Sequence, residues 1–224
     1  MRILRSKSLI ITILFVSLSS CIQVKPRILI IGDSISIGYT PFVKKDLANK
    51  ADVFHNPGNA QHTGTGLKKI DEWIGNEKWD IIQFNWGLWD LCYRHPDSKV
   101  QGNRDKINGE ITYTIDEYAS NLDSIVTILQ SETEAKLIFV TTTYVPENEV
   151  GRFKNDAIRY NDAAKEIMKK HSVIVNDIYE QSIPIHQEVG KGLDDVHYSN
   201  PGSERLSELV TKFLKTEIES MKSK

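Results

Sequence analysis

The sequence predicts an α/β protein in which a parallel sheet carries helices on both faces. Five short apolar runs rich in β-branched residues alternate with amphipathic stretches. Strands that are joined through helices run parallel, because each right-handed crossover returns the chain in the same direction. The chain has 224 residues, of which 40% are hydrophobic and 26% charged, and it shows no internal repeat. This length suits one domain with a substantial core.

The expected strands share one feature, which is an apolar run without strict alternation of polar and apolar residues. This pattern is typical of strands that are buried on both faces, as in a parallel sheet covered by helices. In chain order the strands are expected within residues 27–34, 51–56, 79–87, 135–143 and 172–178.

The expected helices lie between these strands, where apolar residues recur three or four positions apart. That period places them on one buried face of an α-helix. The apolar positions are Leu67, Ile70, Trp73 and Ile74 in one stretch, Tyr118, Leu122, Ile125 and Leu129 in a second, and Ile158, Ala163, Ile167 and Met168 in a third. A last helix is expected over residues 201–221.

A polar segment at residues 91–113 interrupts the alternation. Within it, Asn108 and Gly109 predict a hairpin with a two-residue turn. The segment leaves the carboxyl end of the third expected strand, and ligands of parallel sheets bind at that edge. Two interpretations stay open at this point: the segment overhangs a site, or it is a solvated excursion without a role.

The N-terminus carries a targeting signal. Residues 1–7 hold three positive charges, and residues 9–18 are an apolar run that is too short for a membrane span. The run ends in Leu-Ser-Ser before Cys21, which resembles the lipobox of bacterial lipoproteins. The resemblance implies a signal peptide over residues 1–21, lipidation of Cys21, and one domain over residues 22–224. An ordinary signal peptide with a chance cysteine and an uncleaved anchor are the alternatives.

Composition excludes several classes of partner. The chain has 28 basic and 30 acidic residues, so no basic surplus is available to neutralise the phosphates of a nucleic acid. Histidines and carboxylates lack the spacing of metal ligands, and no glycine-rich nucleotide-binding motif occurs, so neither metal nor cofactor is expected. Cys92 is expected to be a small buried side chain rather than a nucleophile.

Two short motifs near opposite ends of the chain carry the candidate chemistry. Ser34 directly follows the first expected strand, and a serine nucleophile needs a base and donors for the oxyanion. Asp194 precedes His197 by three residues, just before the last helix, and its carboxylate can turn back to accept the imidazole Nδ1 proton. Taken singly, these residues would be read as helix caps. Together they favour catalysis.

The two motifs resemble those of the SGNH hydrolases, also called GDSL-type esterases and acylhydrolases. Their first block matches residues 32–36 (GDSIS), and their last block matches Asp194, His197 and Gly202. The resemblance implies a flavodoxin-like three-layer α/β/α sandwich with a five-stranded parallel sheet. It also implies that the chain is a carboxylic ester hydrolase in which Ser34 is the nucleophile, His197 the general base and Asp194 the residue that orients it.

The two middle blocks of the family are less well matched. For the glycine whose N–H stabilises the oxyanion in the second block, the candidates are Gly58 and the backbone of Gln61, of which Gln61 is favoured by its distance from the next helix. The third block is normally G-x-N-D but reads GLWD at residues 87–90, without the asparagine donor. The indole of Trp89 or the amide of Asn85 is expected to replace it.

The expected reaction is removal of O-acetyl or other short acyl groups from a carbohydrate through an acyl-enzyme. Aromatic side chains are expected to cluster at the carboxyl ends of the third and fourth strands, namely those of Trp86, Trp89, Tyr93 and Tyr144, with Trp86 expected in the core and Trp89 the better site candidate. Such a cluster, together with a lipid anchor in the periplasm or on the cell surface, favours a small-molecule or glycan ester as substrate. Two alternatives remain. The missing asparagine suggests a catalytically weak member that binds carbohydrate at the cell envelope, and an acyl chain on the same aromatic faces would suit a lysophospholipase or lipase-like acylhydrolase.

Overall fold

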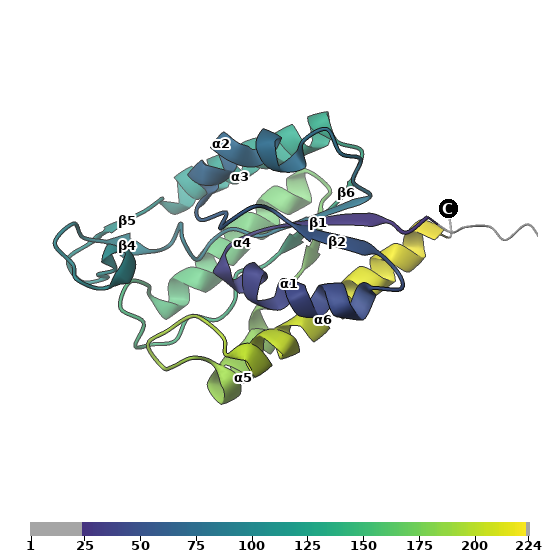
Figure 1. The fold of residues 1–224 in the computed structure, drawn as a ribbon. Helices are drawn as coiled ribbons and strands as arrows, with labels where there is room; N and C mark the ends of the chain where they lie inside the picture. The colour runs from purple at the N-terminus through teal and green to yellow at the C-terminus, as the bar shows by residue number, and fades with distance from the viewer. Residues whose placement is uncertain (1–23, 223–224) are drawn as a thin grey trace, which may run out of the picture.

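The computed structural model describes residues 24–222 and contains a five-stranded parallel sheet (Figure 1). The strand order is β2-β1-β3-β6-β7, which is the flavodoxin-like order. This confirms the predicted fold class, and each strand lies inside an expected range. The strands are β1 (Arg27–Ile31), β2 (Asp52–His55), β3 (Ile81–Phe84), β6 (Lys136–Val140) and β7 (Ile174–Asn176).

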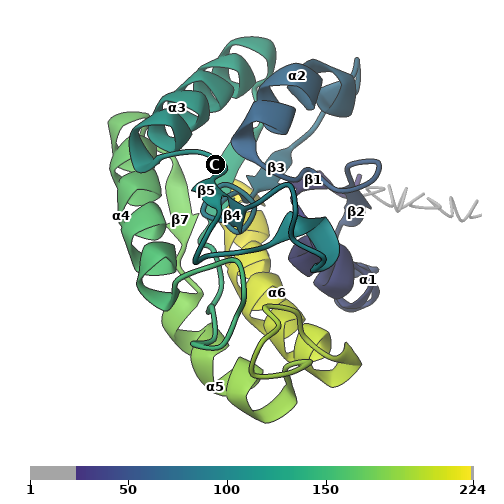
Figure 2. The same ribbon diagram turned by 90° about the vertical axis from the view of Figure 1, so that its left-hand side faces the viewer.

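Helices cover both faces of this sheet. Figures 1 and 2 show α2, α3 and α4 on one face and α1 and α6 on the other, with α5 beside α6. The helices are α1 (Ser34–Leu47), α2 (Thr63–Ile74), α3 (Ile115–Glu132), α4 (Lys154–Lys170), α5 (Tyr179–Val189) and α6 (Asn200–Lys222). The periodicity did not predict α5, because this helix is short and Pro184 interrupts its pattern.

The core lies where the central strands meet the two helix layers. All four residues of β3 are buried, as are four of the five residues of β1. The register pairs Ile31 with Phe84 and Phe84 with Phe139. Because the central strands therefore end at the same level, the loops that follow β1, β3 and β6 emerge side by side at one edge of the sheet.

The polar segment between β3 and α3 is ordered. It contains β4 (Tyr93–Arg94), a 3-10 turn at Gln101–Asn103 and β5 (Glu110–Ile111), and β4 pairs antiparallel with β5. Residues 95–109 separate the two strands, so the predicted two-residue hairpin at Asn108 and Gly109 is wrong. The Asp105 carboxylate accepts the N–H groups of Ile107 and Asn108, and this turn takes the place of the hairpin.

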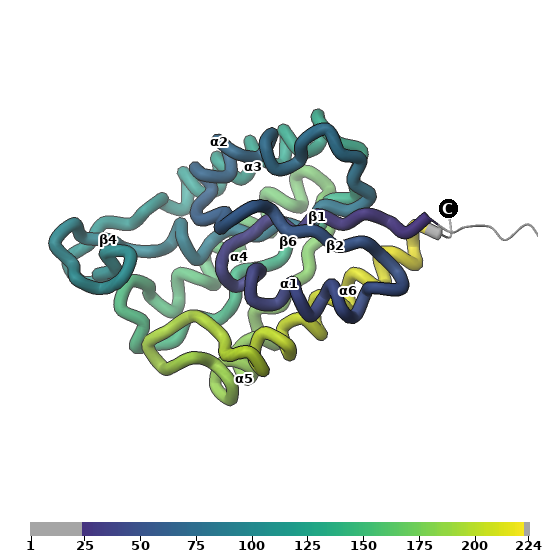
Figure 3. The backbone as a smooth tube through the Cα atoms, in the orientation of Figure 1, coloured from purple at the N-terminus to yellow at the C-terminus, as the bar shows by residue number. Residues whose placement is uncertain are grey.

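Figures 2 and 3 show this segment projecting beyond the carboxyl edge of the sheet. Backbone hydrogen bonds tie it to the loop before α4: Tyr93 N–H donates to the carbonyl of Gly151, and Lys106 N–H donates to that of Val150, both at 2.7 Å. We call residues 91–113 the overhanging loop, because it lies across the edge at which the site forms.

The proposed signal peptide and Cys21 lie outside the residues that the structure describes. The described part of the chain begins, just ahead of β1, at the end of the molecule opposite the overhanging loop (Figure 1). Within residues 24–222 no helix is long and apolar enough to cross a membrane.

Candidate active site

A pocket of about 240 Å³ lies between the carboxyl edge of the sheet and the overhanging loop. Its wall combines segments that are far apart in the sequence: the start of α1, the loops after β2 and β3, the overhanging loop, the loop before α4 and residues 195–197. Both chain ends of the described domain therefore contribute to one cavity, as expected for the carboxyl edge of a parallel sheet.

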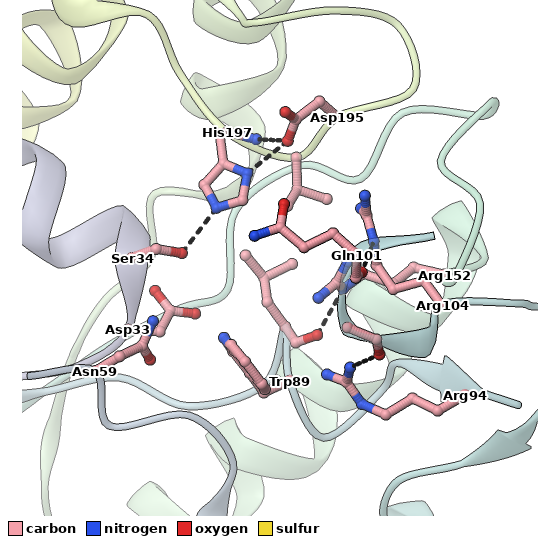
Figure 4. Close-up of a pocket in the computed structure, with 13 residues that line it drawn as sticks. Asp33, Ser34, Asn59, Trp89, Arg94, Gln101, Arg104, Arg152, Asp195 and His197 are labelled. Carbon is pink, nitrogen blue, oxygen red and sulfur yellow. Dashed lines mark hydrogen bonds and ion pairs between the residues drawn. The ribbon is translucent and has the colours of Figure 1, made fainter. Parts of the chain in front are cut away.

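Ser34 and His197, which are 163 positions apart, meet in this pocket (Figure 4). The Ser34 Oγ lies 2.9 Å from His197 Nε2. The other ring nitrogen, Nδ1, lies 2.5 Å from a carboxylate oxygen of Asp195. Because a carboxylate can only accept, it keeps the proton on Nδ1 and leaves Nε2 to accept the serine hydroxyl. This is the hydrogen-bond chain of a nucleophilic serine with its base.

The carboxylate that contacts His197 belongs to Asp195, so the predicted partner, Asp194, is corrected. Asp195 Oδ1 also accepts the backbone N–H of His197 at 2.9 Å, which forms a turn between residues two positions apart. Asp194 is exposed to solvent and lies outside the pocket wall. Burial opposes ionisation of Asp195, but the hydrogen bonds from His197 outweigh it, and the pKa of Asp195 is lowered.

The turn between β1 and α1 sets the position of Ser34. Asp33 is the N-cap of α1, and its Oδ1 accepts the N–H of Ile35 at 2.9 Å. Ser34 is the first residue of the helix, so no carbonyl of a preceding turn accepts its backbone N–H. That N–H, at the positive end of the helix dipole, is available to a developing oxyanion. Asp33 is buried, and burial raises its pKa.

Three of the four residues expected to hold the oxyanion lie outside the pocket wall. Asn85 Nδ2 donates to the carbonyl of Val140 at 2.9 Å, so this amide is already engaged. Gly58 is exposed, and Gln61 has a left-handed backbone with a φ of 52°. Trp89 lines the pocket, with its indole nitrogen on the side of Ser34 and Asn59 (Figure 4).

Asn59 lines the pocket and was missed by the sequence analysis. Its side-chain Oδ1 accepts the backbone N–H of Gln61 at 2.8 Å. This bond orients the amide, and its Nδ2 has no acceptor among residues 24–222. Asn59 therefore presents a fixed donor to the pocket that Ser34 also lines. This donor is a candidate to replace that of the third-block asparagine, which this chain lacks. Only its place after Gly58, in the loop considered for the second block, could have drawn attention to it.

The expected aromatic cluster reduces to one residue. Trp86 is fully buried and stacks on Trp73, as core. Tyr93 and Tyr144 do not line the pocket, whereas Trp89 is half-buried in its wall.

Three arginines that the sequence analysis did not single out also line this pocket: Arg94, Arg104 and Arg152. We call them the arginine wall. Figure 4 shows them on the side away from Ser34, Asp33 and Asn59, with Trp89 between. Guanidinium groups favour carboxylates and phosphates, so the wall supplies the pocket with binding chemistry besides that of the serine.

No group of His, Cys, Asp or Glu side chains in the described part of the chain is arranged to hold a metal ion. Cys92 is free and buried, and burial raises the pKa of its thiol. Its surroundings therefore do not favour the thiolate.

A serine, an imidazole and a carboxylate in hydrogen-bond sequence at the carboxyl edge of a parallel sheet define an α/β serine hydrolase. The family model of the GDSL-like lipase/acylhydrolases matches residues 28–210, and the chain belongs to this family. It is a carboxylic ester hydrolase, as the sequence analysis predicted. Among curated proteins, no relative matches the chain.

Solved structures share the fold at low sequence identity. A lipase/acylhydrolase from Enterococcus faecalis is 22% identical, with a TM-score of 0.68 over 86% of this chain and 96% of its own. The acetyl xylan esterase AlAXEase is 14% identical, with a TM-score of 0.65 over 82% and 97%. An acetylxylan esterase from Geobacillus stearothermophilus is 19% identical, with a TM-score of 0.62 over 84% and 93%.

Proposed function

We propose that this hydrolase removes O-acetyl groups from a carbohydrate through an acyl-enzyme on Ser34. The observation that carries the proposal is a series of two hydrogen bonds. Ser34 Oγ lies 2.9 Å from His197 Nε2, and His197 Nδ1 lies 2.5 Å from Asp195 Oδ1. A serine hydroxyl becomes a nucleophile only when a base of this kind takes its proton.

In the proposed reaction, Ser34 Oγ attacks the acyl carbonyl while His197 Nε2 takes the hydroxyl proton. Asp195 orients the ring and stabilises the imidazolium that forms. The Ser34 N–H, Asn59 Nδ2 and the indole N–H of Trp89 are the donors available to the oxyanion. The intermediate collapses when His197 gives its proton to the leaving alcohol, and a water activated by the same nitrogen then releases the acid.

Two features favour a short acyl group over a long chain. The pocket is small, at about 240 Å³, and much of its wall is charged or polar. A fatty acyl chain needs an extended apolar surface, which the arginine wall does not offer. Trp89 presents a half-buried aromatic face, which suits a sugar ring. The structurally similar acetylxylan esterases are consistent with this proposal, although their low identity carries only the fold.

The proposed location is outside the cytoplasm, in the periplasm or on the cell surface, with a lipid on Cys21 as the anchor. The segment that leads into β1 lies at the end of the molecule opposite the overhanging loop (Figure 1), so a membrane attachment ahead of it would leave the pocket accessible. Expression of the full chain with labelled palmitate tests the anchor. Wild type should incorporate the label and Cys21→Ser should not.

The reaction is tested with 4-nitrophenyl esters of acetate, butyrate and octanoate, followed by acetylated oligosaccharides. We expect kcat/KM to fall with chain length and Ser34→Ala to be inactive. Preference for octanoate would instead indicate a lipase-like acylhydrolase, and activity of Ser34→Ala equal to wild type would exclude the mechanism.

A second candidate is a catalytically weak carbohydrate-binding member, which the engaged amide of Asn85 favours. A fluorophosphonate probe separates the two, because it labels only an activated serine. Rapid labelling of wild type, lost in His197→Ala, would support the enzyme. Absence of labelling together with retained glycan binding would support the binding protein.

A further inference from the structure

The arginine wall contains more positive charge than its own neighbours neutralise. Arg104 and Arg152 both form ion pairs with one carboxylate, that of Glu149. Glu149 is completely buried, and its second oxygen accepts the N–H of Gly151 at 2.8 Å. Arg94 forms no ion pair with any residue between 24 and 222. Two guanidinium groups therefore share one carboxylate, and the third has no paired carboxylate in this part of the chain.

The arginine side chains are held in place before any ligand arrives. Arg152 is buried, and its Nε donates to the carbonyl of Leu88 at 2.6 Å. Arg94 donates to Thr112 Oγ1 at 3.3 Å and to the carbonyl of Gly102, and it lies 4.8 Å from the ring centre of Trp89. A group that is already ordered loses little entropy on binding a ligand.

Each of these three arginines also keeps unused donors. The bonds just described, together with that from Arg104 Nε to the Gln101 carbonyl, involve only Nε and Nη1 atoms. The Nη2 atoms of all three have no acceptor within the described residues. A planar carboxylate matches such donors, because guanidinium groups bind it through paired N–H···O contacts.

Two carboxylates, those of Asp33 and Asp195, line the same pocket as the arginine wall. Burial raises the pKa of Asp33 and the charge of Arg152 opposes this rise, while the charge of Arg104 helps to lower the pKa of Asp195. Asp195 is paired with His197. Burial lowers the pKa of Arg94, and the charges of Arg152 and Arg104 lower it further, so an incoming anion would relieve their mutual repulsion.

We propose that the arginine wall binds a carboxylate on the alcohol part of the substrate, so that the enzyme deacylates an acidic saccharide. This inference rests on the proposed function: an acetyl group carries no charge, so the anion must belong to the alcohol that is released. The wall and Ser34 line the same small pocket, so the carboxylate and the scissile ester would occupy it together.

The test compares two acetates that differ in charge, 4-acetoxybenzoate and its methyl ester. Each kcat/KM is divided by the rate constant for hydroxide-catalysed hydrolysis, which corrects for the leaving group. We expect wild type to prefer the anion by about tenfold or more, since charge-assisted hydrogen bonds are involved. Added salt should reduce the preference.

Substitutions of single arginines test whether the preference for the anionic acetate depends on the arginine wall. Arg94→Gln should lower the ratio of anionic to neutral kcat/KM by about tenfold, and Arg94→Lys should restore part of it. The matched control is Arg205→Gln in α6, outside the pocket, which removes an arginine charge paired with Glu188 and should leave the ratio unchanged. Arg94→Lys keeps the test usable if Arg94→Gln does not fold.

Several outcomes would overturn the inference. One is equal corrected rates for the two acetates with wild type; another is an unchanged ratio in folded Arg94→Gln. A third is a preference for mono-4-nitrophenyl succinate over 4-nitrophenyl butyrate that exceeds the preference for 4-acetoxybenzoate over its methyl ester. This result would place the anion on the acyl part of the substrate. If neither acetate is hydrolysed, the proposed function fails, and calorimetric binding of 4-acetoxybenzoate to Ser34→Ala, compared with its methyl ester, still decides whether the wall binds a carboxylate.

Discussion

The carboxylate of Asp195 accepts both the ring Nδ1–H and the backbone N–H of His197, at 2.5 and 2.9 Å. One oxygen thus fixes the position of the loop and the tautomer of the imidazole. The neighbouring Asp194 is exposed and makes neither contact.

This pair of adjacent aspartates provides a matched test. Asp195→Asn should lower kcat for an aryl acetate by roughly 10²–10⁴-fold, because an amide at this position no longer enforces the productive tautomer. Asp194→Asn, which removes the same charge one position away, should change kcat by less than about twofold. A larger loss in the Asp194 variant would refute the assignment of Asp195.

Asn59 is expected to act as an oxyanion donor. Asn59→Ala should lower kcat and kcat/KM together, by up to about 10²–10³-fold, because the bond to the oxyanion forms only in the transition state. Steady-state kinetics on 4-nitrophenyl acetate measure kcat and KM separately and show whether both kcat and kcat/KM fall. The control is Asn148→Ala, an exposed asparagine outside the pocket, which should behave as wild type. A rise in KM alone would show that Asn59 only positions the substrate.

Asp90 makes folding stability depend on pH. It is a buried residue of the loop that follows β3, and Thr63 donates to its Oδ1 through both N–H and Oγ1. Burial raises the pKa of Asp90 to about 7. The folded protein thus holds a proton that the unfolded chain releases above about pH 4, so stability from this group is full at low pH and is lost as pH rises toward 7.

The expected loss is on the order of 2–4 kcal/mol between pH 4 and pH 7. Chemical denaturation across this range should show it as a difference between wild type and Asp90→Asn, which has no proton to lose. Asp97→Asn, an exposed aspartate of the overhanging loop, should keep the wild-type pH dependence. Parallel curves for wild type and Asp90→Asn would contradict the prediction.

Glu149 is expected to stabilise the arginine wall. Glu149→Gln should destabilise the protein by about 3–5 kcal/mol, because it leaves the buried guanidinium of Arg152 without its counter-ion. Glu147→Gln, an exposed glutamate two positions earlier, should change the free energy of unfolding by less than about 0.5 kcal/mol. Urea denaturation measures both, and similar values for the two variants would mean that Glu149 does not stabilise this cluster.

Much of the fold was predictable because its signals are local. Apolar runs such as residues 27–31 and 81–84 are buried on both faces, and a chain with that pattern has few other ways to exclude them from water. The helix α5 and the turn at Asp105 were not predictable in this way. Pro184 weakens the helical pattern, and the partner of β5 is β4, which fifteen intervening residues separate from it, rather than the residues directly before the turn.

The candidate site likewise contains residues that local motifs predict and residues that only the tertiary structure brings together. Ser34 and His197 stood out because each lies in a short motif of fixed form. Asn59 and the arginine wall lie in loops whose residues meet only when the overhanging loop folds across the edge of the sheet. The choice of Asp195 over Asp194 depends on which direction each side chain takes in one turn, and motif spacing does not specify that.

The amino-acid sequence by itself determined the class of fold and singled out Ser34 and His197 as the proposed nucleophile and base, since periodic burial and short motifs are encoded by neighbouring residues. The tertiary structure alone decided which carboxylate contacts His197, which amide lines the pocket with Ser34, and that three arginines line this pocket while only two of them pair with Glu149. Those relationships join positions from different loops, and their distances exist only after the sheet has aligned the ends of its strands.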